Sequence, residues 1–140
     1  MQLIYTSEKR NFMAMKKLLF IVFAFFTMTA FAQSTVKITP KSCISKKGYH
    51  LRLKSIVSDS RCPEGVTCIW AGEVSAIVEV YKDREFVMEN VITFNAKNRE
   101  ENMAWFSKYY PEKITNIEVG PYPKEGVVIK PKKRYIKITF

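Results

Sequence analysis

Apolar and polar residues alternate in several short segments of the chain after residue 33. Each segment places its apolar side chains at every second position, and turns rich in charge, glycine or proline separate the segments. Alternation of period two is typical of strands with one buried face. The clearest examples are residues 35–39, 49–54, 74–81, 86–94 and 135–140. The pattern predicts an all-β, antiparallel fold, in which residues 74–94 form a hairpin around a polar turn.

The phase of the alternation predicts which side chains face the core. Ile56 and Val57 are consecutive apolar residues that interrupt the alternation. Such an interruption indicates a β-bulge or a strand that is covered on both faces. The expected core residues of the two longest segments are Tyr49, Leu51, Leu53, Val74, Ala76, Val78 and Val80.

Residues 98–110 fit two different patterns. Asn98 and Glu101 have the spacing of a capping box, and Met103, Phe106 and Tyr110 keep a helical spacing. Alternate residues from 103 to 109 equally fit one face of a strand. We favour the strand.

The number and spacing of the strands predict the fold class. Weaker apolar segments at 117–119 and 127–129 bring the expected number of strands to about seven. Short strands separated by turns, within about a hundred residues, are typical of an antiparallel β-sandwich. We therefore predict one small β-sandwich domain over residues 33–140.

The N-terminal segment has the pattern of an export signal. Met15-Lys16-Lys17 is a short basic start, the apolar stretch 18–30 follows, and Ala30-Phe31-Ala32 provides the small residues that a signal peptidase reads. Residues 1–32 are interpreted as an over-long start plus a signal peptide that is cleaved before Gln33. The apolar stretch is shorter than the ~20 residues that span a bilayer. We predict a periplasmic or secreted protein without stable membrane insertion after cleavage.

The formal net charge of the chain is +10, which is compatible with a nucleic-acid partner. The lysines are dispersed, however, and the densest basic cluster, residues 130–134, has no aromatic stacking platform beside it. No nucleic-acid-binding motif is present. We predict no nucleic-acid binding.

Two of the three cysteines close a short loop. Cys62 and Cys68 are separated by five residues, and Pro63-Glu64-Gly65 can turn the chain back between them. In an oxidising compartment this spacing indicates a structural disulfide. A zinc site would need Cys43 and His50 as further ligands, and the spacing is not that of a redox motif. We predict the disulfide, a buried unpaired Cys43, and neither metal nor cofactor.

The residue inventory does not support catalysis. His50 is the sole histidine and falls on a charged strand face, so no nucleophile–base pair is supported. Asp59, Glu64 and Glu73 are close in sequence, but Arg61 lies among them and neutralised loop charges are the simpler interpretation. We predict that the protein is not an enzyme.

A covalently closed loop between two strands suggests a recognition element, because a rigid loop loses little entropy on binding. Arg61 and Glu64 would supply polar contacts. Trp70 is expected to pack over the disulfide, and it becomes a binding anchor only if it is exposed. The loop equally fits a role that only staples the domain. The functional hypothesis is a non-catalytic envelope or secreted module that contacts a protein or a glycan. The alternative is a periplasmic protein that binds a small ligand or a metal.

The segment DSRCPEGVTCIWAGE (residues 59–73), together with Pro121-Tyr122-Pro123, resembles a group of small exported Bacteroidetes proteins and lipoproteins. The resemblance extends from about Gly48 to Phe140. It implies an all-β envelope protein, and the group has no established activity from which functional residues could be transferred. Many members begin with a lipid-attachment cysteine. This chain has Gln33 at that position, which favours a soluble form.

Overall fold

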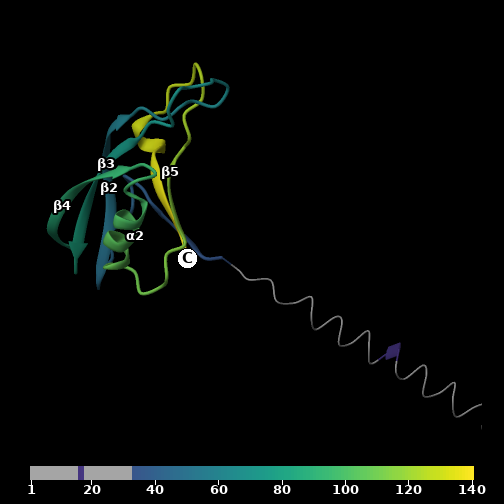
Figure 1. Cartoon of the computed structure of the whole chain (residues 1–140). Coiled ribbons are helices and arrows are strands. Elements are labelled where there is room, and N and C mark those ends of the chain that lie inside the picture. Colours follow the sequence, from purple (N-terminus) through teal and green to yellow (C-terminus); the bar gives the residue numbers. More distant parts are fainter. Residues whose placement is uncertain (1–15, 18–32) are drawn as a thin grey trace, which may run out of the picture. The chain divides into compact units, whose positions relative to one another are not determined.

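The structure is a computed structural model that describes residues 16–17 and 33–140. The predicted signal peptide lies outside the described residues, apart from Lys16 and Lys17. The described part is mostly strand, with one short α-helix and a 3₁₀ turn (Figure 1). Its elements are β1 (Thr35–Ile38), β2 (Tyr49–Asp59), β3 (Val74–Lys82), β4 (Glu85–Phe94), α2 (Arg99–Ser107), β5 (Asn116–Gly120), η1 (Pro131–Lys133) and β6 (Tyr135–Thr139). The all-β prediction is confirmed, with six strands where about seven were expected.

The strands form two antiparallel sheets of three strands each, in the orders β1-β6-β5 and β2-β3-β4. The predicted hairpin is confirmed as β3 and β4, which pair along their whole length. Its turn holds Asp83 and Arg84, both with positive φ (51° and 75°). A two-residue turn with positive φ at both positions has a backbone twist that matches the twist of the flanking strands, and such turns therefore commonly close β-hairpins.

One hydrophobic core contains residues of both sheets and the helix. The inward face of β3 lies at its centre, since Val74, Ala76, Val78 and Val80 are at most 1% exposed, as their alternation predicts. Leu51 and Leu53 are also buried, but Tyr49 is half exposed. Tyr49 is the first residue of β2, and its ring contacts Tyr109 at the margin of the core. The other sheet contributes four buried residues to this core: Ile38, Val119, Ile136 and Ile138.

Strand β2 contains two irregularities in its pairing with β3, at Lys54 and at Val57. The bulge indicated by Ile56 and Val57 is therefore confirmed. Each extra residue shifts the phase of the strand by one position, which turns the following side chains to the opposite face. The first shift brings Ile56 to the same face as Leu53, and the second restores the original phase, so that Asp59 pairs with the buried Val74 on that core face.

The interpretation of residues 98–110 as a strand is wrong, because Arg99–Ser107 is the helix α2. The helix packs against β4, where Phe106 is fully buried and its ring lies 6.2 Å from that of Phe94. The amide of Asn102 donates to the carbonyl of Thr93 at 2.9 Å. Both contacts need the three- and four-residue spacing of a helix. The segment 127–129, expected as a strand, is a loop.

Candidate functional site: two paired loops

Two long loops lie side by side at one end of the domain (Figure 1). The first loop, residues 60–73, joins β2 to β3, and the second loop, residues 121–130, follows β5. Glu64 connects them through its backbone, because its N–H donates to the carbonyl of Pro123 at 3.0 Å and its carbonyl accepts from the N–H of Glu125 at 3.4 Å. Each sheet therefore contributes one loop to a single structure.

The neck of the first loop continues the β2–β3 pairing. The N–H of Ser60 donates to the carbonyl of Glu73 at 2.8 Å, and that of Cys62 donates to Ala71 at 3.1 Å. Gly72 has a positive φ of 71°, and a Cβ atom there would lie 1.9 Å from the carbonyl oxygen of Ser60. Only glycine fits this close approach of the two chain segments.

The disulfide Cys62–Cys68 closes the first loop, as predicted, with its Cα atoms 5.8 Å apart. Cys43 is a free cysteine, but it is exposed, so the expectation that it is buried is wrong. It lies between β1 and β2, in a segment that the sheets do not cover.

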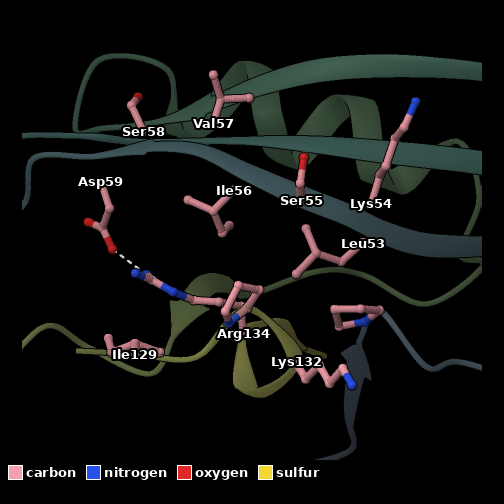
Figure 2. Close-up of a pocket in the computed structure, with 12 residues that line it drawn as sticks. Leu53, Lys54, Ser55, Ile56, Val57, Ser58, Asp59, Ile129, Lys132 and Arg134 are labelled. Atoms are coloured by element: carbon pink, nitrogen blue, oxygen red, sulfur yellow. Dashed lines mark hydrogen bonds and ion pairs between the residues drawn. The ribbon is translucent and has the colours of Figure 1, made fainter.

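A buried carboxylate holds the bases of both loops. Asp59 accepts two hydrogen bonds from Arg61, from Nε to Oδ1 and from Nη2 to Oδ2, both at 2.8 Å. Arg134 donates to the same Oδ2 atom (Figure 2). The three side chains are only 9% to 16% exposed. Burial acts to raise the pKa of Asp59, and the hydrogen bonds and charges of the two arginines outweigh it, so that the pKa falls to about 2.

Arg61 is used inside the domain rather than at its surface. Its Nη1 donates to the carbonyl of Val119 at 2.5 Å, its Nη2 reaches that of Pro121 at 3.3 Å, and its guanidinium lies over the ring of Tyr122. Arg61 thus ties the end of β2 to the end of β5, in the other sheet. This geometry assigns it a structural role, where sequence reasoning expected a polar contact with a partner.

Glu64, the other expected polar contact, is exposed and faces Lys124 of the second loop at 3.2 Å. Both side chains are more than half exposed. An ion pair in that setting contributes at most about 1 kcal/mol. Its carboxylate is therefore available to a partner, while its backbone holds the two loops together.

Both loops carry exposed apolar side chains. Ile69 is 105% exposed, Trp70 78% and Val128 91%. Trp70 was expected to pack over the disulfide, and the structure places it in solvent instead. Its loop extends past the last sheet residues through the narrow neck, so no second layer covers it. We call these exposed residues the apolar loop tip: Val66, Ile69, Trp70, Val127 and Val128.

Sequence reasoning missed Arg134 and most of the apolar loop tip. Arg134 is 75 residues from Asp59, so no local pattern connects them. The tip had a signal, since Ile69-Trp70 and Val127-Val128 are apolar pairs in segments that carry glycine and no regular alternation. Ile69-Trp70 lies outside the predicted strands and so has no core face to occupy, whereas Val127-Val128 lies in the segment that was expected to be a strand.

A further cluster of titratable side chains lies on β2 and β3, where Glu79 accepts hydrogen bonds from Arg52 at 2.7 Å and from Tyr81 at 3.1 Å. His50 lies opposite Tyr81 in the β2–β3 pairing. Its pKa is lowered mainly by burial and to a smaller extent by the positive charge of Arg52. Within residues 16–17 and 33–140, no group of three or more His, Cys, Asp or Glu side chains is placed to hold a metal ion. The same residues contain no helix long and apolar enough to cross a membrane.

Comparisons of the chain with protein-family models, with curated proteins and with solved structures found no match. The functional argument therefore rests on the geometry of the paired loops.

Proposed function

We propose that this chain is an exported, non-catalytic β-sandwich module that binds a partner protein of the cell envelope through its apolar loop tip. The observation that supports the proposal is the exposure of Ile69 and Trp70, which are consecutive and directly follow Cys68 of the disulfide-closed loop. Exposed large apolar side chains are common when scattered, whereas several on two connected loops mark an interaction site.

The composition of the tip favours a protein over a glycan. Glycan sites combine an aromatic platform with several polar groups that bind hydroxyls. Here Trp70 is accompanied by isoleucine and valine, and the charged side chains of Glu64 and Lys124 on the two loops are more than half exposed. A tryptophan surrounded by aliphatic residues and a polar rim is the usual composition of a protein–protein hot spot.

The loop bases keep the tip in one arrangement before binding. The disulfide restrains the first loop, and Asp59 with its two arginines fixes both loops to the two sheets. Ordering loose loops on binding opposes affinity, so loops that are already fixed favour it.

A capture experiment tests this function. The protein and its variants Ile69→Ser and Trp70→Ala are immobilised and exposed to envelope extract, and captured proteins are identified by mass spectrometry. Val91→Ser is the control, because Val91 is also an exposed apolar residue (59%) and lies on β4, away from the two loops. We expect one protein to be retained by the original chain and by the control, and reduced at least about tenfold by each tip variant, which corresponds to 1.4 kcal/mol.

Equal capture by the tip variants would refute the apolar loop tip as the contact surface. Release of the captured protein by free oligosaccharide would instead favour a glycan-binding function. Unchanged melting temperatures of the tip variants are expected, since surface substitutions rarely alter stability by more than about 0.5 kcal/mol.

Export is the second part of the proposal. It is supported by the Ala-x-Ala pattern before Gln33 and by the disulfide, which requires an oxidising compartment to persist. The intact mass of the protein recovered from periplasm or medium should begin at Gln33. A mature species that retains residues 15–32 would contradict cleavage at this position.

A further inference from the structure

A groove of about 360 Å³ runs along strand β2, below the base of the paired loops. One wall is formed by residues 53–59 of β2, and the other by Ile129, Pro131, Lys132 and Arg134. Figure 2 shows Leu53 and Ile56 pointing from β2 toward the opposite wall, and Asp59 closing one end by its contact with Arg134. The volume lies within the range of ligand-binding pockets.

The groove lies along a free sheet edge. In the order β2-β3-β4, strand β2 bonds to β3 on one side and has no strand neighbour on the other. In the described residues, no backbone hydrogen bond joins β2 to the wall at 129–134. Alternate backbone groups of an edge strand point outward, and they can pair with an extended segment of another chain.

The chemistry of the walls selects the kind of segment. Leu53, Ile56 and Ile129 provide an apolar floor, and Lys132 lies exposed on the turn η1. The carboxylate of Asp59 also lines the groove, but it is held between Arg61 and Arg134, so that this cluster carries a net positive charge. The groove therefore complements a segment that alternates apolar and acidic side chains.

We propose that this groove binds an extended acidic peptide segment of a partner protein, which adds to β2 as a short extra strand. The two bulges at Lys54 and Val57 interrupt the edge, so only a short segment can pair with it. This site is separate from the apolar loop tip, and it does not depend on the function proposed for the tip.

Titration of the isotope-labelled protein with synthetic peptides, followed by amide NMR, tests the proposal. The probe is a five-residue peptide that alternates valine and aspartate. Its comparison peptides replace aspartate by lysine or carry N-methyl groups on alternate backbone nitrogens. Lys132→Glu reverses a charge in the groove, and the matched control Lys133→Glu makes the same change on the next residue, which does not line it.

We expect the acidic peptide to shift amide signals of residues 53–59 and 129–134 and to bind at least about fivefold more weakly to Lys132→Glu. The Lys133→Glu variant should bind within about twofold of the original protein, as expected for an exposed charge outside the contact. Lysine-containing and N-methylated peptides should not bind.

Equal binding of acidic and basic peptides would overturn the charge argument, and equal binding of the N-methylated peptide would overturn strand addition. Absence of shifts along β2 would show that the bulges and lysines only protect the edge from association. None of these results affects the loop tip, whose variants Ile69→Ser and Trp70→Ala should bind the acidic peptide normally.

Discussion

Replacement of Asp59 by asparagine removes the charge that fixes both loops while it keeps the size of the side chain. The folded-state pKa of about 2, against an ordinary value of 3.8, corresponds to roughly 2.4 kcal/mol of stabilisation at neutral pH. Solvent screening lowers this figure, whereas leaving Arg61 and Arg134 without their partner adds a penalty that reaches 3–5 kcal/mol in fully buried pairs. We expect Asp59→Asn to lower the free energy of unfolding by about 2–4 kcal/mol.

The pH dependence separates this effect from a simple packing defect. The pKa of Asp59 is depressed in the folded state, so its stabilisation is present above the unfolded value of 3.8 and is lost as the pH falls toward 2. The variant lacks this titration. The difference in stability between the two proteins should therefore be largest near pH 7 and shrink between pH 4 and pH 2. The lowered pKa of Glu79 acts in the same direction in both proteins and cancels in the difference.

Urea unfolding followed by tryptophan fluorescence and circular dichroism, at several pH values from 7 to 2.5, measures this difference. Glu89→Gln is the control, because both side chains of its ion pair with Lys54 are nearly half exposed and solvent screening leaves such a pair little effect on stability. A loss of stability below about 1 kcal/mol for Asp59→Asn, or a loss that does not change with pH, would refute the proposal that the ion pairs of Asp59 with Arg61 and Arg134 fix the loop bases.

Further substitutions test the neck, the helix and the disulfide. Gly72→Ala should destabilise the domain by more than about 2 kcal/mol in thermal unfolding, because its Cβ would collide with the backbone of Ser60. Gly126 has the same φ of 71° but open space around it, so Gly126→Ala should lose only about 1 kcal/mol in the same assay. Phe106→Ala should lower the unfolding free energy by about 3–5 kcal/mol, which would not occur if this side chain lay on an exposed strand face. Non-reducing peptide mapping should recover Cys62 linked to Cys68, and a major product containing Cys43 would contradict that pairing.

The sequence was sufficient to predict a secondary-structure element where the spacing of its apolar residues fits a strand and does not fit a helix. Strand β3 has a uniform face of Val74, Ala76, Val78 and Val80, and all four are buried. Residues 98–110 fit both the helical and the strand spacing of apolar residues. Tertiary contacts decide in favour of the helix, namely the burial of Phe106 against β4. Periodicity carries no information about such contacts.

The candidate site was predictable only where it is local. The short spacing of the cysteines was enough to predict the disulfide. The contact between Asp59 and Arg134 could not be predicted in this way, because the two residues are 75 positions apart in the sequence. Arg61 was expected to contact a partner because it lies on the closed loop. Its bonds to Asp59 and to the carbonyls of Val119 and Pro121 turn it inward instead, and the two residues that hold these carbonyls are 58 and 60 positions away in the sequence.

The two halves of the site have opposite chemistry, and their order along the loops explains how they work together. At the base, charged groups are buried and satisfied, which specifies one arrangement of the two sheets and their loops. Above the bases, apolar groups of both loops are exposed, and the proposed contact with a partner rests on them. A flexible loop with the same side chains would lose much of the gain on binding to ordering. The ion pairs of Asp59 and the Cys62–Cys68 bond therefore fix the two loops on which the proposed contact surface lies.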